Sequence, residues 1–335
     1  MNRNEDINQI RIFAGSSSIE FVKKMCNYLE ILPGECEILH FQEGNIYVKI
    51  LENVRNKDIY LVQTIGLSPN NSFVELLFWI DSFKRSSVNS VTVILPYFSY
   101  AKADKKDEPR VSIRARVCAD CLETAGADRV IAIDLHSPQI QGFFKIPVDH
   151  LYAYTLLSEY IETLEIPDLV VVSPDVGFAK NARKYSAFLH VPTVICDKTR
   201  NDHTGEAHII EMFGNIENKN ALIVDDFTIT CGTLIEAANI LKQNGAKRIF
   251  ALVTHALLDK KAIQVLEKSF IEKLVITDTV ENCAVLNNSK IKIISVAPLI
   301  AEAVRIIQNK GSLSSLFDHL PKETVKSCFK QIHGI

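Results

Sequence analysis

The sequence lacks an excess of charge of either sign. Its 37 Lys and Arg residues nearly balance its 40 Asp and Glu residues, which leaves a formal net charge of −3 at pH 7. Proteins that bind nucleic acids or anionic membrane surfaces usually concentrate positive charge in one region. The balanced composition shows no such footprint, so we expect neither a nucleic acid nor a membrane as a partner.

Long apolar runs are missing as well. No stretch reaches the roughly 18 apolar residues that a membrane-spanning helix needs. The first residues, M-N-R-N-E-D-I-N, lack the apolar core of a secretory signal. These two features favour a cytoplasmic protein.

Cysteines at disulfide or zinc-site spacing are scarce. The eight cysteines are scattered and lie mostly in apolar segments, which is typical of reduced, buried thiols. Cys118 and Cys121 form a single C-x-x-C, but the surrounding residues have the pattern of a continuous helix. Because no second cysteine pair follows at zinc-site spacing, we interpret this motif as structural.

What the sequence does contain is a regular alternation of apolar strands and amphipathic helices. A chain of 335 residues exceeds what one hydrophobic core usually organises. The segment G-A-D-R-V-I-A-I-D-L-H, from residue 126, returns as G-A-K-R-I-F-A-L-V-T-H from residue 245. The repeat predicts an α/β protein with two tandem domains, residues 1–155 and 156–335, each with a mainly parallel sheet flanked by helices.

Residues 222–237 read L-I-V-D-D-F-T-I-T-C-G-T-L-I-E-A and predict a strand, a tight turn and a helix start. Two carboxylates, Asp225 and Asp226, end the strand; such a pair suits the hydroxyls of a sugar or a bound Mg²⁺. Gly232 is expected to let the backbone turn, and N–H groups at the helix start favour a phosphate. The stretch predicts a site for a phosphorylated sugar, and an ordinary capped turn is the alternative. The turn consists of Thr230, Cys231, Gly232 and Thr233.

Polar side chains also end other predicted strands. Asp134 and His136 end one strand, and strand alternation predicts that both point to the same side. A carboxylate beside an imidazole can hold a divalent cation, and Asp175, after another strand, adds an oxygen ligand. The alternative for His136 is a purely structural hydrogen bond, which we expect for His255, its counterpart in the repeat.

Two charged segments complete the candidates. Lys198 and Arg200 project together if their strand continues, and such a cation pair can stabilise a transferring phosphoryl group. Exposed cations in loops are nevertheless common. The charged loop at residues 97–111 is either a binding loop or mobile lid, or a solvated turn.

The turn at residues 230–233, preceded by two acidic residues, resembles the phosphoribosyl-diphosphate-binding loop of type I phosphoribosyltransferases. Nearly the whole chain resembles the ribose-phosphate pyrophosphokinases, or phosphoribosyl-diphosphate synthetases. The motifs that carry this resemblance are L-P-Y-F-x-Y-A at 95–101, D-L-H-S-x-Q-I-Q-G-F-F at 134–144 followed by P-V-D, S-P-D at 173–175, D-K-x-R at 197–200 and V-D-D at 224–226.

The resemblance implies two phosphoribosyltransferase-like domains and transfer of the diphosphoryl group of ATP to C1 of ribose 5-phosphate, with Mg²⁺ as cofactor. The products are phosphoribosyl diphosphate, used in nucleotide biosynthesis, and AMP. It also implies a dimer-based homo-oligomer, such as the hexamer that is common in this family. By this resemblance, the metal ligands are His136 and Asp175, with Asp134 and Asp149 close by.

The same resemblance assigns the remaining roles. Lys198 and Arg200 lie on a catalytic loop and stabilise the transition state. Asp225 and Asp226 hold the ribose hydroxyls, and residues 230–233 hold the 5-phosphate. The residues implied near ATP are Phe41, Glu43, Asn45, Lys102 and Asp104.

The chain departs from the usual pattern of the family at Glu43 and Asn45, at Lys102 and Ala103, at Lys145 and at Ile229; the positions that bear on activity are Asn45, Ala103, Lys145 and Ile229. They favour one alternative, a catalytically weak paralogue that regulates an active synthetase. A phosphoribosyltransferase that consumes the diphosphate is a second alternative, based on the phosphate loop alone. Because the implied metal ligands, cations and ribose carboxylates are all retained, we expect a working enzyme.

Overall fold

The computed structural model describes residues 9–200, 207–286, 288–318 and 320–330. The chain forms two compact units, and its junction between Tyr152 and Ala153 lies near the predicted division at residues 155 and 156. The C-terminal segment, however, packs with the first unit, so a single division does not describe the chain. The first unit comprises Met1–Tyr152, Thr279–Glu281 and Val296–Cys328, and the second comprises Ala153–Asp278, Asn282–Ser295 and Phe329–Ile335.

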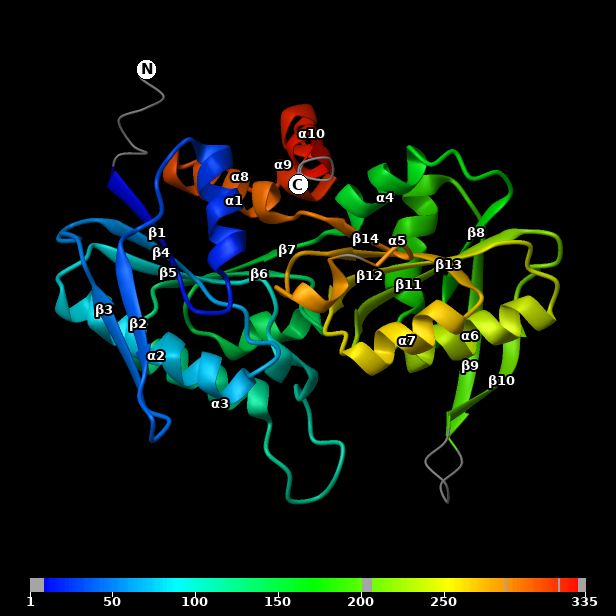
Figure 1. Ribbon diagram of the computed structural model, residues 1–335, viewed down its shortest axis with the longest axis horizontal. Helices are drawn as coiled ribbons and strands as arrows, with labels where there is room; N and C mark the ends of the chain where they lie inside the picture. The colour runs from blue at the N-terminus through cyan, green and yellow to red at the C-terminus, as the bar shows by residue number, and fades with distance from the viewer. Residues whose placement is uncertain (1–8, 201–206, 287, 319, 331–335) are drawn as a thin grey trace. The chain divides into compact units, whose positions relative to one another are not determined.

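A sheet of five parallel strands forms the centre of the first unit, in the order β1-β4-β5-β6-β7 (Figure 1). Its strands are short apolar runs that are buried on both faces, as in β5, which reads S-V-T-V-I-L. The strands are β1 (Ile10–Ala14), β4 (Asp58–Val62), β5 (Ser90–Leu95), β6 (Arg129–Ile133) and β7 (Val148–Leu151).

Helices cover both faces of this sheet. Helices α2 (Pro69–Arg85) and α3 (Arg114–Ala125) lie on one face, and α1 (Ile19–Leu29) and α8 (Ala297–Gln308) lie on the other (Figure 1). The apolar sides of α1 and α8 pack together, which explains why the C-terminal segment belongs to the first unit. The unit also contains the short helices η2 (Ser99–Lys102), η3 (Pro138–Phe143), α9 (Ser315–Asp318) and most of α10 (Lys322–Lys330).

A hairpin forms a separate two-stranded sheet. Strands β2 (Cys36–His40) and β3 (Ile46–Ile50) pair in antiparallel fashion. The loop between them turns at Gly44, whose φ of 89° lies in the left-handed region that favours glycine. The hairpin packs against α2, and its loop side chains are exposed.

The second unit contains a seven-stranded sheet in the order β10-β9-β8-β11-β12-β13-β14. Six strands are parallel, and β10 is the antiparallel edge strand that pairs with β9. The strands are β8 (Leu169–Ser173), β9 (Thr193–Arg200), β10 (Ala207–Phe213), β11 (Asn220–Thr228), β12 (Ile249–Ala256), β13 (Ile271–Thr277) and β14 (Ile291–Ile294). The helices are α4 (Tyr154–Glu162), α5 (Ala179–Leu189), α6 (Gly232–Gln243), α7 (Lys260–Lys268) and the short η4 (Cys283–Val285).

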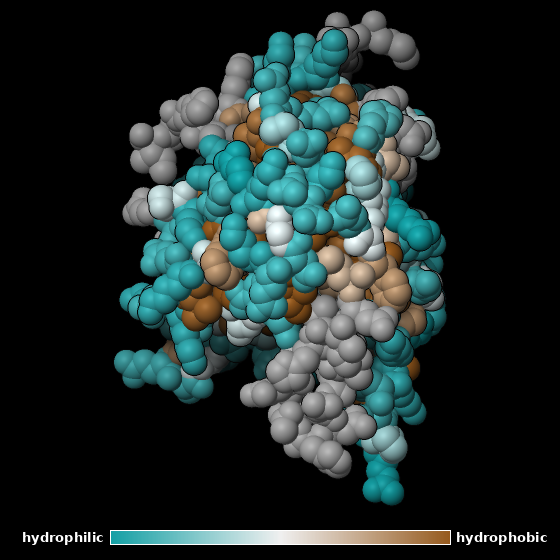
Figure 2. Space-filling view, turned by 90° about the vertical axis from the view of Figure 1, so that its right-hand side faces the viewer, coloured by the Kyte–Doolittle hydropathy of each residue, from teal (hydrophilic) through white to brown (hydrophobic). Residues whose placement is uncertain are grey.

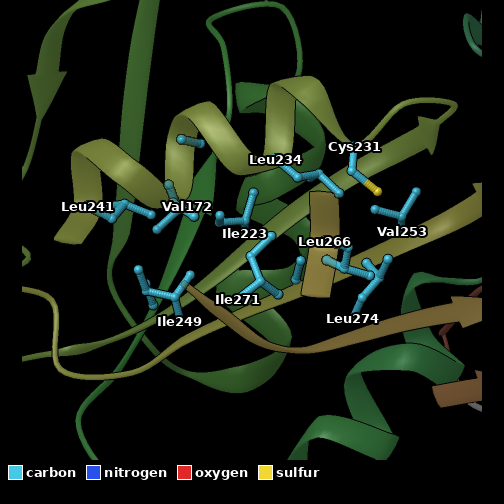
Figure 3. Packing of buried hydrophobic residues seen from close by; sticks show 14 of the residues in the cluster. Val172, Ile223, Cys231, Leu234, Leu241, Ile249, Val253, Leu266, Ile271 and Leu274 are labelled. Atoms are coloured by element: carbon cyan, nitrogen blue, oxygen red, sulfur yellow. The ribbon is translucent and has the colours of Figure 1, made fainter. Parts of the chain in front are cut away.

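The core of the second unit lies between its sheet and helices α6 and α7. Leu234 on α6 and Leu266 on α7 pack against strand residues such as Ile223 and Val253 (Figure 3). Figure 2 shows one face of the molecule, on which hydrophilic side chains predominate and hydrophobic ones form small groups. In the described part of the chain, no helix combines the length and apolar character needed to cross a membrane.

The repeated segments fold alike, as predicted. Each has a helix, a glycine in the left-handed region and a buried strand; φ is 111° at Gly126 and 86° at Gly245. The two histidines differ, however. His255 lies within β12 and is buried, whereas His136 lies beyond the end of β6 and is exposed.

Candidate active site

Three carboxylates of the second unit lie at one edge of its sheet. Strands β8 and β11 are parallel neighbours, with Val172 opposite Ile223. Asp175 follows the carboxyl end of β8, and Asp225 and Asp226 lie near the carboxyl end of β11. From β8 the chain continues to β9 on one side, while β11 lies on the other. Ligands of open α/β sheets bind at such a switch point.

The Asp225 carboxyl lies in an unfavourable environment for a charge. Burial raises the pKa of Asp225 well above its usual value, and the negative charges of Asp226 and, more weakly, Asp175 raise it further. The Oδ1 atom of Asp225 accepts a hydrogen bond of 3.0 Å from the N–H of Asp226. The carboxylates of Asp225, Asp226 and Asp175 therefore raise the negative charge at this end of the strands. Such an environment favours a ligand that brings hydroxyl donors or a cation.

Asp175 is held in place by local hydrogen bonds. Its Oδ1 atom accepts a 2.9 Å hydrogen bond from the N–H of Phe178, just before α5, and its carbonyl accepts a 2.7 Å bond from the Ser173 hydroxyl. The sequence S-P-D thus folds into a tight turn that fixes the carboxylate at the strand end.

The turn before α6 differs from the prediction in one respect. The residue in the left-handed region is Cys231, with φ of 59°, and not Gly232, so the prediction that Gly232 makes the turn was wrong. The Cys231 side chain points into the core beside Leu234 (Figure 3), and this apolar packing stabilises the unusual backbone. Burial raises the pKa of its thiol to about 11, so Cys231 is neutral near pH 7.

The backbone N–H groups of this turn make long hydrogen bonds. Cys231 N donates to the Thr228 hydroxyl at 3.2 Å, and Gly232 N donates to the Thr230 hydroxyl at 3.3 Å. The side chain of Cys231, the N-cap residue of α6, accepts no capping hydrogen bond from the first turn of the helix. A helix start whose N–H groups make only such long hydrogen bonds to neutral hydroxyls suits a phosphate.

The remaining predicted residues of this unit lie close by in sequence. Thr233 is half-buried in the first turn of α6, and Ile229 is 47% exposed. Strand β9 continues as far as Arg200, where it pairs with Ala207 of β10. The backbone of Lys198 and Arg200 therefore belongs to an antiparallel ribbon, while their side chains lie outside the described part of the structure.

In the first unit, the segment after β6 forms a loop and does not continue the strand. Asp134 has a φ of 38°, in the left-handed region, and its N–H donates to the carbonyl of Leu151 at 3.0 Å. The prediction that strand alternation points Asp134 and His136 to one side was therefore wrong, because β6 ends at Ile133. Asp134 is half-buried and His136 is exposed.

Asp149 lies on β7 opposite Ile131, and its carboxylate forms a 2.5 Å ion pair with Arg129 on β6. This carboxylate therefore has a cationic partner within the sheet, and its expected place near Asp134 stays a prediction. Across the described residues, no group of three or more His, Cys, Asp or Glu side chains is arranged to hold a metal ion.

The residues predicted near ATP lie on two segments of the first unit. Phe41, at the hairpin loop, is 45% exposed, and its ring lies 6.4 Å from that of Tyr47. Glu43 and Asn45 are exposed in the same loop, where the Asn45 side chain accepts a 2.8 Å hydrogen bond from the N–H of Ile46. The hairpin thus presents an aromatic pair to its surroundings.

The second segment is the loop after β5, at the same sheet edge as the loop of Asp134. The Lys102 ammonium lies 5.8 Å from the centroid of the Tyr97 ring. Ala103 is buried, and its carbonyl accepts from the N–H of Ala115 on α3. Asp104 is half-buried and begins the exposed part of the loop.

Two further residues of the first unit bear on the site. His150 is buried, and its Nε2 atom accepts a 2.9 Å hydrogen bond from the N–H of Leu135, in the loop after β6. The sequence motifs gave His150 no role, although a histidine within the predicted strand V-D-H-L was a signal of a specific contact. Lys145, a departure from the family pattern, is exposed, and its N–H donates to Glu123 of α3, away from that loop.

Comparison with known protein families identifies both halves of the chain. The model for the N-terminal domain of ribose phosphate pyrophosphokinase matches residues 10–126. The model for the phosphoribosyl synthetase-associated domain matches residues 202–318. Together the two models cover parts of both structural units.

Individual relatives match almost end to end. The chain is 39% identical over 307 residues to the ribose-phosphate pyrophosphokinase of Campylobacter jejuni, which covers 92% of this chain and 98% of the relative. It is 41% identical over 309 residues to that of Oceanobacillus iheyensis, covering 92% and 97%. The phosphoribosylpyrophosphate synthetase structure from Mycobacterium smegmatis matches with a TM-score of 0.84 and 34% identity, over 90% of this chain and 100% of that one.

Proposed function

This chain belongs to the ribose-phosphate pyrophosphokinase family, and we propose that it transfers the β,γ-diphosphoryl group of ATP to the C1 hydroxyl of ribose 5-phosphate. The products are phosphoribosyl diphosphate and AMP. The observation that carries the proposal is the sheet edge of the second unit. There, the Asp225 and Asp226 carboxylates precede a helix start whose N–H groups make long hydrogen bonds to threonine hydroxyls, within a chain that matches pyrophosphokinases over more than nine-tenths of its length.

Ribose 5-phosphate is assigned to the second unit. Asp225 and Asp226 accept hydrogen bonds from the ribose hydroxyls, which places sugar donors against the excess of negative charge. The 5-phosphate accepts from the backbone N–H groups of residues 230–233. In the free protein, two of these N–H groups make bonds of 3.2 and 3.3 Å to threonine hydroxyls, and a phosphate is a stronger acceptor. Binding therefore exchanges weak internal bonds for charge-assisted ones.

Mg²⁺ is the cofactor that the family implies, and the chemistry of the donors fits it. Oxygen donors from Asp175, Asp225 and Asp226 accumulate near one another, and a hard dication prefers such ligands. In the first unit, Asp134 and His136 supply a carboxylate and an exposed imidazole on one loop. We assign Asp134 and His136 as Mg²⁺ ligands in the first unit and Asp175 as a Mg²⁺ ligand in the second, and we omit Asp149, which is paired with Arg129. When bound, the cation offsets the charge of the ATP phosphates.

The diphosphoryl transfer itself requires stabilisation of charge on the moving phosphorus group. We assign this role to Lys198 and Arg200, which share the end of β9. ATP is assigned to the first unit. There, Phe41 offers an exposed ring for the adenine base, Glu43 and Asn45 flank it in the same loop, and Lys102 and Asp104 lie on the loop that would meet the phosphates.

The direct test is to incubate the purified protein with ATP, Mg²⁺ and ribose 5-phosphate and to follow AMP and phosphoribosyl diphosphate. The proposal predicts that both products appear together in equal amounts and that AMP is absent when ribose 5-phosphate is omitted. A regulatory paralogue yields neither product, and a phosphoribosyltransferase consumes added phosphoribosyl diphosphate. Either result would replace the proposed activity.

A matched pair of variants links the activity to the proposed residues. Asp226→Asn keeps the size of the side chain and removes a carboxylate assigned to the ribose hydroxyls. Asp168→Asn removes an exposed carboxylate just before β8, at the opposite end of the strands in the same unit. We expect the first change to raise the KM for ribose 5-phosphate at least about tenfold, since a charged hydrogen bond contributes about 1.5–3 kcal/mol. The second should leave KM unchanged.

A further inference from the structure

A buried imidazole supports the loop that carries Asp134 and His136. His150 lies on β7, is 4% exposed, and packs against Tyr152, with ring centroids 4.3 Å apart and the ring planes tilted by 40°. Its Nε2 atom lies 2.9 Å from the backbone N of Leu135, the residue between the two proposed ligands. A backbone N–H can only donate, so Nε2 supplies the lone pair and carries no proton.

The same strand holds the preceding peptide group. The N–H of Asp134 donates to the carbonyl of Leu151, at 3.0 Å, so two consecutive N–H groups of the loop are bound by neighbouring residues of β7. These bonds fix the peptide planes on both sides of Asp134. A non-glycine residue with φ of 38° is costly and persists where its surroundings determine it. The strained loop is therefore maintained by β7.

We propose that His150 is a positioning residue for the divalent cation, which it orients through the N–H of Leu135. The inference rests on the proposed function, because it takes Asp134 and His136 as ligands. His150 does not touch the cation. It fixes the peptide between the two ligands, so that a carboxylate and an imidazole from one short loop are presented in a defined arrangement. Residues that orient metal ligands in this way affect metal affinity by about 10–100-fold.

The test compares variants with and without a hydrogen-bond acceptor at this position. His150→Phe keeps an aromatic ring against Tyr152 and removes both nitrogens, whereas His150→Gln places an amide oxygen at about the reach of Nε2. The Kd for Mn²⁺ is measured on the protein without nucleotide, by the electron paramagnetic resonance of the free ion. The apparent constant for Mg²⁺ in turnover and the melting temperature are measured in parallel.

We expect His150→Phe to raise the Kd for Mn²⁺ about tenfold or more and His150→Gln to restore it to within about threefold of the parent. A change of melting temperature in His150→Phe with an unchanged Kd for Mn²⁺ overturns the proposal and leaves an ordinary structural histidine. His255→Phe is the control, since His255 is also a buried histidine on a strand, in the second unit. It should leave the Kd for Mn²⁺ unchanged.

Two further outcomes are decisive. If His150→Phe does not fold, His150→Gln and His150→Asn decide, because their amide oxygens lie at different distances from the main chain. They must then differ in the Kd for Mn²⁺ at similar melting temperatures, and equal values overturn the inference. A parent protein that binds Mn²⁺ but yields no AMP refutes the proposed function alone, whereas a parent that binds no Mn²⁺ refutes the positioning role.

Discussion

Replacing Asp225 with asparagine should stabilise the ligand-free protein while impairing its activity. Asparagine has the shape of aspartate, and its amide oxygen can still accept the hydrogen bond from the N–H of Asp226. The change therefore removes a charge and leaves the local backbone bond in place. The charge is unfavourable in the free protein, since burial and the neighbouring carboxylates raise the pKa of Asp225.

The sign of the effect follows from proton linkage. Below the ordinary carboxyl pKa of about 3.9, Asp225 is protonated in both the folded and the unfolded chain and costs no stability. As pH rises above that value, the unfolded chain ionises first, because the folded-state pKa is raised. The free energy of unfolding then falls until the pH passes the folded-state pKa. The Asp225→Asn variant does not lose this free energy of unfolding as the pH rises. It should therefore be more stable than the parent at pH 7 and equally stable near pH 4.

The expected gain in the free energy of unfolding is that of a typical substitution that removes an unfavourable charge from a binding site. Substitutions of this kind stabilise by about 0.5–2 kcal/mol. For a structural unit of this size, about 1 kcal/mol corresponds to an increase of about 2–4 °C in the melting temperature. The measurement is thermal unfolding by circular dichroism in a metal-free buffer without phosphate, at pH 4 and pH 7, with kcat and KM measured separately at pH 7.

Asp259→Asn is the control, because it removes an exposed carboxylate at the start of α7, where a negative charge is favourable. It should leave the melting temperature unchanged or slightly lower. If Asp225→Asn lowers the melting temperature at pH 7, or if its effect is the same at pH 4, the account of charge repulsion at this sheet edge fails. Retention of full activity would remove Asp225 from the ribose site.

Three further changes test other parts of the argument. Ile229→Asp should alter the affinity for ribose 5-phosphate only several-fold, because Ile229 is 47% exposed and the phosphate is assigned to backbone N–H groups; if the parent is inactive and this change alone creates turnover, the chain is a degenerate paralogue. Lys198→Ala should lower kcat far more than it changes KM, since the cation is proposed to meet charge of the transition state, and an unchanged kcat in steady-state assays excludes that role. Asp149→Asn should lower the free energy of unfolding, measured by urea titration, by about 0.5–1 kcal/mol, because the ion pair with Arg129 is lost. It should leave the apparent constant for Mg²⁺ in turnover unchanged, and an increase in that constant would return Asp149 to the metal site.

Local sequence patterns were sufficient for the elements of this fold. The apolar run from Val91 to Leu95 and the repeated Gly-Ala turns predict buried strands after helices, and the structure confirms them, with both glycines in the left-handed region. The placement of Asp175, Asp225 and Asp226 at strand ends also followed from sequence. These features depend on residues close together in the chain, where side-chain period and turn preference act directly.

Other features depended on contacts between distant segments. The packing of α8 on α1 is absent from any local period, because it brings together residues far apart in sequence. The same is true of Asp149, which reads as one more acidic candidate in sequence and pairs with Arg129 in the structure. Which partner a charged side chain meets is decided by the sheet register.

The backbone of the two proposed binding loops shows most clearly which features sequence determines and which depend on the tertiary structure. Sequence identified the turn at residues 230–233 and the motif D-L-H at 134–136. It predicted that Gly232 makes the turn and that the D-L-H motif continues the preceding strand. The tertiary structure instead places Cys231 in the left-handed region, because its side chain is buried in the core under α6. It bends the chain at Asp134, because β7 binds the adjacent N–H groups. Sequence thus determined which residues the loops contain, and long-range packing determined their conformation, since the cost of an unusual φ is offset only by contacts formed on folding.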